Sequence, residues 1–161
     1  MGSLKINVDG AYLRESNTGA MGGVLRDNNG ILMGFLWLHQ RAGWIRWAQL
    51  SLQKQRRSEM ACGSYHEVPW STILVETDSQ ELALLWKNRR RNLSEIYVIL
   101  EEVEEMASYF STFRVIHTRR SANFAAHLCA QHATSLLDNF VWSLPPSFLQ
   151  QCLQFDCNNV V

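Results

Sequence analysis

The feature that most constrains the fold is the segment STILVE at residues 71–76, a continuous β-branched and apolar run that ends at Thr77-Asp78-Ser79. Such a run is typical of a strand buried on both faces, and strands of this kind occur in sheets that helices cover on both sides. Ser79 is suited to cap the following segment, QELALLWKN, as a helix. We therefore expect an α/β protein in which Asp78 lies at the C-terminal end of a strand.

Further strands are expected on both sides of this segment. Residues 4–8 alternate between apolar and polar side chains, which predicts a half-buried strand that runs directly into Asp9-Gly10. Two apolar runs flank the segment DNNG at residues 27–30, and Asn-Gly favours a tight hairpin turn, so the second and third strands should be antiparallel. Residues 113–117 are expected to form a fifth strand.

Two more helices are predicted, and one long segment has no clear pattern. The first of these two helices starts at about residue 94 and has apolar residues on one face. The glutamates of residues 101–105 lie mostly on its other faces and are expected to form an ordinary solvated surface. The second, NFAAHLCAQHA at residues 123–133, has small side chains that favour close packing on a sheet. Residues 39–70 show neither a helical nor a strand period.

Composition limits the class of protein. A chain of 161 residues is long enough for one domain with its own core, and its 47% apolar and 19% charged residues are globular values. Fifteen basic and fifteen acidic residues cancel, which argues against a dedicated DNA-binding protein. The four cysteines form no Cys-x-x-Cys pair, and no signal peptide or membrane-spanning run is visible, so we expect reduced thiols in an intracellular protein, nuclear or cytoplasmic.

Two carboxylates are placed where they can bind a metal together. Asp9 follows the first predicted strand and Asp78 follows the strand at residues 71–76. Carboxylates that converge at one edge of a sheet can bind Mg²⁺, which prefers oxygen ligands and phosphate partners. Each residue also has a plainer interpretation, because Asp-Gly commonly forms a turn and Asp-Ser commonly starts a helix.

Four segments in order, INVDGAY, GGVLRDNNGILMGF, ILVETDSQE and HTRRSANFAAHLCA, resemble the successive motifs of the ribonuclease H superfamily. The resemblance is to the plant reverse-transcriptase-like branch, which derives from retroelements, and it covers residues 4–136; residues 137–161 resemble the C-terminal extension of that branch. It implies a ribonuclease-H-like five-stranded mixed sheet, whose first three strands are antiparallel, flanked by helices. It also implies endonucleolytic cleavage of RNA in RNA–DNA hybrids, with two Mg²⁺ ions held by Asp, Glu, Asp and Asp.

Only two of these four acids have counterparts in the chain. Asp9 matches the first and Asp78 the third, and both are expected metal ligands. The fourth position is His127, whose neutral ring could bind a softer metal or serve as an ordinary polar helix residue. The second acid should lie near Lys54, where its usual helix motif is absent; Glu59 is a candidate substitute, although it stands too close to Asp78 for the usual helix, turn and strand.

A frame shift would explain both the missing Glu and the patternless segment. With permitted codons for LQKQRRSEMACG, residues 52–63, a frame two nucleotides later encodes AEAEALRDGLR, which is the expected helix motif. Our hypothesis is that roughly residues 42–69 are translated out of frame between in-frame flanks. Sequencing the transcript tests this: an in-frame message, with no close paralogue carrying AEAEALRDGLR, would contradict it.

Basic residues near the expected site are candidate contacts for a phosphate backbone, although a solvated charge run is the ordinary alternative. Trp86 beside them either stacks on a base or, more commonly for a Trp on such a helix, belongs to the core. The candidate nucleic-acid contacts, which include one Asn of the last motif, are Lys87, Arg89, Arg90, Arg91, Arg119, Arg120 and Asn123.

Three functional interpretations remain open at this level. The first is a Mg²⁺-dependent RNA–DNA hybrid ribonuclease, impaired by the two missing acids. The second is a non-catalytic remnant of a retroelement that binds nucleic acid or another partner. The third is a product that folds poorly because it lacks the helix expected near Lys54. That helix normally covers one face of the sheet, and its loss would expose the core. The oligomeric state and biological substrate are not indicated.

Overall fold

The structure, a computed structural model, describes residues 2–14, 18–39, 70–89, 97–135, 140–142 and 144–157. The strands are β1 (Gly2–Leu13), β2 (Thr18–Asp27), β3 (Leu32–His39), β4 (Trp70–Thr77), β5 (Thr112–His117) and β6 (Phe140–Trp142). The helices are α2 (Gln80–Lys87), α3 (Tyr97–Ala107), α4 (Phe124–Thr134) and α5 (Ser147–Cys157), with a short 3₁₀ helix at Arg120–Asn123.

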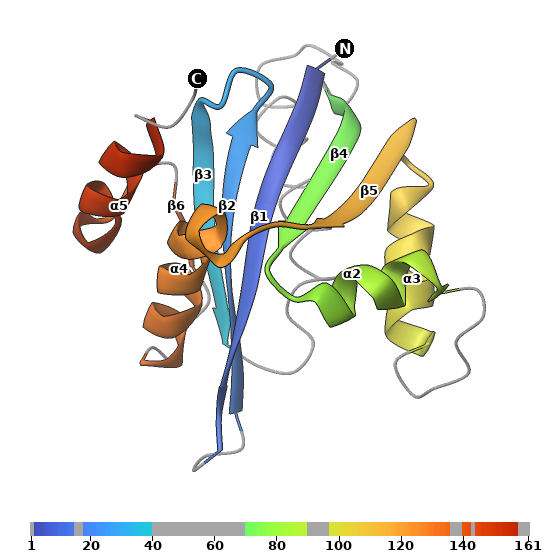
Figure 1. Cartoon of the computed structure of the whole chain (residues 1–161), viewed down its shortest axis with the longest axis horizontal. Coiled ribbons are helices and arrows are strands. Elements are labelled where there is room, and N and C mark those ends of the chain that lie inside the picture. The colour runs from blue at the N-terminus through green and yellow to red at the C-terminus, as the bar shows by residue number, and fades with distance from the viewer. Residues whose placement is uncertain are drawn as a thin grey trace, which may run out of the picture.

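The strands form one mixed sheet in the order β5-β4-β1-β2-β3-β6 (Figure 1). β1, β2 and β3 are successively antiparallel, whereas β4 is parallel to β1 and β5 is parallel to β4. The expected five-stranded mixed sheet is therefore confirmed. The structure adds β6, a three-residue strand that the sequence did not predict and that pairs antiparallel with β3 at the sheet edge.

The predicted hairpin at residues 27–30 is also confirmed. Gly30 has φ +77°, and its N–H donates to the Asp27 carbonyl at 3.0 Å. The Asp27 carboxylate accepts hydrogen bonds from the backbone N–H groups of Asn29 and Ile31 at 2.9 and 2.8 Å. Because side-chain acceptors of this kind replace backbone partners in a turn, Asp27 and Gly30 fix the register of β2 against β3.

Hydrophobic side chains pack on both faces of the sheet. Alternate residues of β1 and β4 point to one face, where they form a cluster of buried apolar side chains: Leu4, Ile6, Val8, Ile73 and Val75. On the other face, α4 packs across β1, β2 and β3, and α5 packs against α4 (Figure 1). The sheet is thus covered by α4 on the face that carries Asp9, since Asp9 points opposite to Val8.

Helices α2 and α3 pack together beside β4 and β5 (Figure 1). Ser79 caps α2, as predicted, by accepting a hydrogen bond from the Leu82 N–H at 3.1 Å. Trp86 is buried, and its ring centroid lies 5.3 Å from that of Phe113, so its interpretation as a core residue is confirmed. Helix α3 is described from Tyr97, and the first residues of the predicted helix lie outside the described part of the chain.

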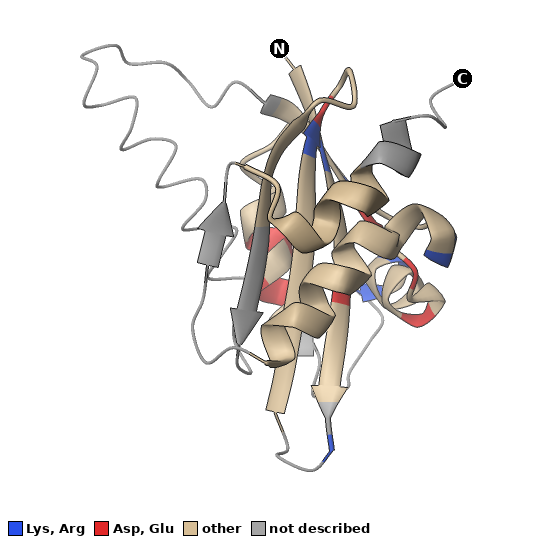
Figure 2. Cartoon of the chain, turned by 90° about the vertical axis from the view of Figure 1, so that its left-hand side faces the viewer, with Lys and Arg blue, Asp and Glu red and all other residues tan. Residues whose placement is uncertain are grey.

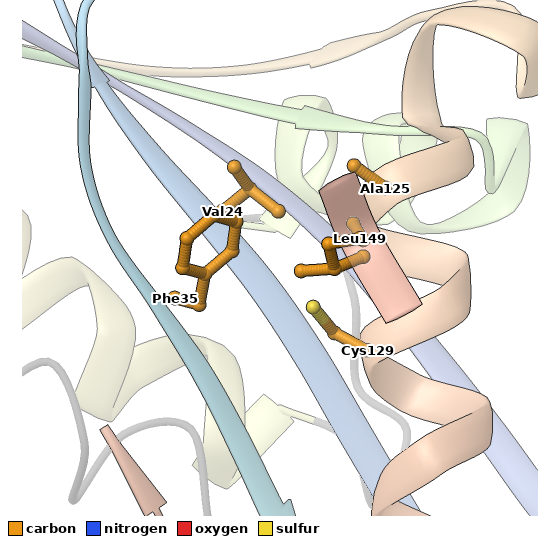
Figure 3. Close-up of a cluster of buried hydrophobic side chains, with 6 residues drawn as sticks. Val24, Phe35, Ala125, Cys129 and Leu149 are labelled. Carbon is orange, nitrogen blue, oxygen red and sulfur yellow. The ribbon is translucent and has the colours of Figure 1, made fainter. Parts of the chain in front are cut away.

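The C-terminal segment contributes to the same core. Leu149 of α5 is fully buried and lies in one cluster with Val24, Phe35 and Cys129 (Figure 3). Residues 137–161 were expected to be an extension of the domain, and α5 packs as an integral part of it. Within the described residues, no helix has the length and apolar character needed to cross a membrane.

Burial controls the chemistry of Cys129. The pKa of this thiol is raised to about 12, mainly by burial and to a smaller extent by Cys152, while Arg26 acts in the opposite direction. The folded protein therefore keeps the thiol proton up to higher pH than the unfolded chain, so the stability linked to this group is complete below the ordinary cysteine pKa and falls as pH rises from there toward 12.

We expect native Cys129 to resist alkylation. With iodoacetamide at pH 8.5, peptide mass spectrometry should find half-buried Cys152 modified well before Cys129, because the reactive species is an accessible thiolate. Both thiols should react in denaturant. Equal rates for the two cysteines in the native protein would contradict the buried position of Cys129.

Candidate active site

Asp9 lies inside β1 rather than at its end. Gly10 pairs with Met21 and the strand continues to Leu13, so the expected strand end at Asp9-Gly10, and the alternative of a turn there, are both wrong. The parallel pairing between β1 and β4 stops at Val8 and Thr77, because β4 ends there. Asp9 is therefore the first residue of β1 beyond the pairing with β4, where its carboxylate side chain is 16% exposed.

Asp78 occupies the matching position on β4. It directly follows Thr77, which is the register partner of Val8, just as Asp9 follows Val8. Neighbouring strands are separated by about 4.8 Å, so this register brings the two aspartates to the same point of the sheet. The convergence of Asp9 and Asp78 stays a prediction, which this register favours.

His127 of α4 holds the Asp9 carboxylate. Its Nδ1 lies 2.7 Å from Asp9 Oδ2, and its Nε2 lies 3.4 Å from Nη2 of Arg120. An ionised carboxylate only accepts and a guanidinium only donates, so these partners together fit a neutral ring with the proton on Nδ1. The backbone N–H of Gly10 donates to the other carboxylate oxygen of Asp9 at 2.8 Å.

Asn123, immediately before α4, holds Asp78. Its Nδ2 donates to Asp78 Oδ1 at 3.2 Å and to the Val8 carbonyl at 2.9 Å. The side chain is 1% exposed, and its Oδ1 accepts a hydrogen bond from Asn7 at 3.2 Å. Burial and these internal partners leave no surface on Asn123 for the nucleic-acid contact that we expected, so its place is structural support of Asp78.

Comparison with known proteins agrees with this arrangement. A family model described as reverse transcriptase-like matches residues 66–133. The fold resembles that of RNase H1 from the halophilic archaeon Halobacterium salinarum, with a TM-score of 0.59 and 18% identity over 83% of this chain and 98% of that one. Residues 66–133 are therefore similar to the reverse transcriptase-like family, and the chain has a ribonuclease H fold.

Two other solved structures support this fold. The N-terminal RNase H domain of a Mycobacterium tuberculosis protein matches with a TM-score of 0.59 and 15% identity, over 84% of this chain and 95% of that one. LC11-RNase H1 in complex with RNA/DNA hybrid matches with a TM-score of 0.52 and 12% identity, over 82% and 96%. No curated protein matches the sequence.

The two aspartates of the candidate site fit one metal ion better than two. Among the described residues, no group of three or more His, Cys, Asp or Glu side chains is arranged to hold a metal. Asp9 and Asp78 supply two carboxylates, which suits a single Mg²⁺ that completes its shell with water and phosphate. Glu59, the candidate substitute for the second acid, lies outside the described residues.

The predicted basic contacts have different surroundings in this domain. Arg119 and Arg120 are exposed directly before α4, and Lys87 is exposed at the end of α2, whereas Arg90 and Arg91 lie outside the described residues. Arg89 is engaged internally. Its guanidinium stacks 4.1 Å from the Trp86 ring centroid and lies 3.2 Å from Glu104 Oε1, so it joins α2 to α3.

The face of the domain over α4 has little charge of its own. Helix α4 contains no Lys, Arg, Asp or Glu, and the helices on this side are mostly tan in Figure 2. Arg120 brings positive charge toward Asp9, because its Nη2 lies 3.4 Å from His127 Nε2. Phe124, which the sequence did not single out, adds an exposed aromatic ring whose centroid is 6.2 Å from that of His127.

Two further residues of the site were missed by the sequence. Asn7 and Glu76 each stand two residues before the aspartate of their strand, and they are register partners. Asn7 was assigned to the polar side of a half-buried strand, yet it is only 2% exposed because α4 and the residues before it cover that side. Its spacing from Asp9 is the signal that places it on the same face.

Proposed function

We propose that this domain binds RNA–DNA hybrid beside Asp9 and Asp78, and that it cleaves the RNA strand endonucleolytically with Mg²⁺ at an impaired rate. The observation that carries the proposal is that Asp9 and Asp78 directly follow the register partners Val8 and Thr77, and that each is held by a side chain from the start of α4. The complex of LC11-RNase H1, a protein of the same fold, with RNA/DNA hybrid supports the substrate class. The motif resemblance supports a plant retroelement as the source.

Each residue of the candidate site has a separate role in this proposal. Asp9 and Asp78 would hold the ion, which when bound polarises a phosphodiester and lowers the pKa of a coordinated water. His127 fixes the rotation of the Asp9 carboxylate, and Asn123 fixes that of Asp78. The exposed guanidinium groups of Arg119 and Arg120 would contact backbone phosphates, which position a nucleic acid without reading its sequence.

The impairment follows from the same residues. In the family arrangement a fourth acid stands where this chain has His127, and an imidazole supplies no anionic oxygen. Two carboxylates support one ion, whereas stabilising both the attacking and the leaving oxygen takes two. Cleavage should therefore be slow, and it should require higher Mg²⁺ concentrations than a site with four acids.

A cleavage assay on an end-labelled RNA–DNA hybrid tests the proposal. We expect slow, Mg²⁺-dependent cleavage that falls on the order of 100-fold or more in Asp9→Asn and in Asp78→Asn, since loss of a supporting residue alone commonly costs 10–100-fold. Glu102→Gln, which removes one exposed carboxylate from α3, is the matched control and should leave the rate unchanged. Equal cleavage by all four proteins would point to a contaminating nuclease and contradict the proposal.

A version of the chain with AEAEALRDGLR in place of residues 52–63 extends the same assay. Activity only in this version would mean that the present chain is a disabled copy. Substantial activity in the chain as it stands would mean that Glu59 or another group completes the site.

His127 favours a second candidate function, which is binding of hybrid without catalysis. Its Nδ1 proton occupies Asp9 Oδ2, one of the few carboxylate oxygens that an ion would need. Fluorescence anisotropy with a labelled hybrid in EDTA distinguishes this case. Tight binding without metal, together with no cleavage at any Mg²⁺ concentration, would favour the second candidate over the first.

A further inference from the structure

A buried chain of polar side chains runs behind Asp78 between the sheet and the start of α4. Asn7 is 2% exposed and Asn123 is 1% exposed, and a buried amide is costly unless its donors and acceptor are paired. Both amides are paired in this structure. What needs explanation is the direction in which each amide points, because exchanging its oxygen and nitrogen would reverse every contact.

Two charged residues set the direction of Asn7. Its Nδ2 donates to Glu76 Oε2 at 2.8 Å, and an ionised carboxylate can only accept. Its Oδ1 accepts from Nη1 of Arg26 at 2.9 Å, and a guanidinium can only donate. Lys5 Nζ lies 3.5 Å from the same Glu76 oxygen, on the side away from Asn123 in this series of contacts. The amide of Asn7 therefore has one allowed orientation.

The orientation of the Asn7 amide determines the orientation of the Asn123 amide. The second N–H of Asn7 Nδ2 points to Asn123 Oδ1 at 3.2 Å, so the nitrogen of Asn123 faces the opposite way. There it donates to the Val8 carbonyl and to Asp78 Oδ1. In the reversed orientation, the oxygen of Asn123 would face two acceptors, which is unfavourable in a buried position.

We propose that Glu76 and Asn7 are positioning residues for Asp78, which act through Asn123 by holding its amide donor against the carboxylate. The inference rests on the proposed function for the role of Asp78, but the hydrogen-bond direction itself is a property of the protein alone. Glu76 lies two residues before Asp78 and acts on it through Asn7 and Asn123. Its contribution is the acceptor-only character of its carboxylate.

Two substitutions of nearly unchanged shape test the direction. Glu76→Gln places an amide at position 76, which can donate as well as accept a hydrogen bond. Asn7 then no longer faces a group that can only accept. Asn7→Asp offers only acceptors to Asn123, so the amide of Asn123 should turn its nitrogen away from Asp78. Combining the two should relieve the repulsion between carboxylates at positions 7 and 76 and recover thermal stability, while Asn123 stays reversed.

The first readout needs neither metal nor substrate. In metal-free ¹⁵N-labelled protein, the Asn123 side-chain amide should give two slowly exchanging proton signals with contacts to Val8. In Glu76→Gln these signals should shift and exchange faster, and in the double variant the contacts to Val8 should be lost despite recovered stability. Lys5→Met removes only the ion pair at 3.5 Å and should leave the signals in place.

The second readout is a Mg²⁺ titration followed at the Asp78 backbone amide and in hybrid cleavage. We expect Glu76→Gln and the double variant to need on the order of tenfold more Mg²⁺, with Lys5→Met unchanged. Recovery of both stability and Mg²⁺ affinity in the double variant, or unchanged Asn123 signals in Glu76→Gln, would overturn the inference. If the unaltered chain neither binds Mg²⁺ nor cleaves, the proposed function fails, and the Asn123 signals still decide whether Glu76 and Asn7 orient that amide.

Discussion

Replacing Gly22 with alanine should destabilise the domain by about 3 kcal/mol, at the upper end of the usual cost of overpacking. A Cβ atom at Gly22 would approach the Ala130 nitrogen, the Ala126 carbonyl oxygen and the Cys129 Cβ, all well under 3.0 Å. Two of these atoms are backbone atoms of α4 and cannot turn aside as a flexible side chain can. The whole helix would have to move away from β2, and His127 would move away from Asp9 with it.

Urea unfolding followed by circular dichroism measures this effect, and the same sheet offers matched controls. A Cβ at Gly10 or Gly19 would meet nothing closer than 4.0 or 3.9 Å. Gly10→Ala and Gly19→Ala should therefore change the free energy of unfolding little. If Gly22→Ala unfolded at the same urea concentration as these two variants, the close approach of α4 to β2 would be wrong.

The same contact shows which parts of the fold local sequence can predict. The small residues of α4 indicated close packing on a sheet, and the structure places Ala126 and Ala130 directly over Gly22. The strand at β4 and the hairpin at residues 27–30 were also recognisable, because their patterns are local. The end of β1 was not: Asp9-Gly10 resembles a turn, and only the pairing of Asp9 with Gly22 in β2 keeps that segment extended.

The main residues of the candidate site were recognisable from the sequence, and the side chains that support them were not. Asp9, Asp78 and His127 were found because each belongs to a motif, and the structure brings His127 into contact with Asp9. Alternation along β1 correctly put Asn7 on the face opposite to Val8, but it cannot tell which element covers that face. Because α4 covers it, Asn7 became a buried partner of Asn123 rather than a solvated side chain.

The C-terminal segment was the least predictable part of the fold. β6 has only three residues, which is too short for a strand period, and its pairing with β3 depends on residues more than 100 positions earlier in the chain. Among the described side chains of α5, Leu149 is fully buried, and Phe148, Cys152 and Leu153 are partly buried against the same cluster.

Leu149→Ala should lower the free energy of unfolding by about 2–5 kcal/mol, because a fully buried leucine leaves a cavity when it is truncated. Figure 3 shows its side chain between Val24 and Phe35 of the sheet and Cys129 of α4. The surrounding residues come from three elements that other contacts hold in place, so they cannot easily collapse into the space. Thermal unfolding by calorimetry and urea titration both measure the loss.

Leu144→Ala is the matched control, because it makes the same truncation in the same segment at a side chain that is 76% exposed. It should change stability by no more than about 0.5 kcal/mol. A large loss of unfolding free energy in Leu149→Ala, with none in Leu144→Ala, would mean that residues 147–157 complete the core on the α4 side. A version shortened to residues 4–136 should then unfold more readily. Equal, small effects would instead mean that α5 is dispensable and that the domain ends near residue 136.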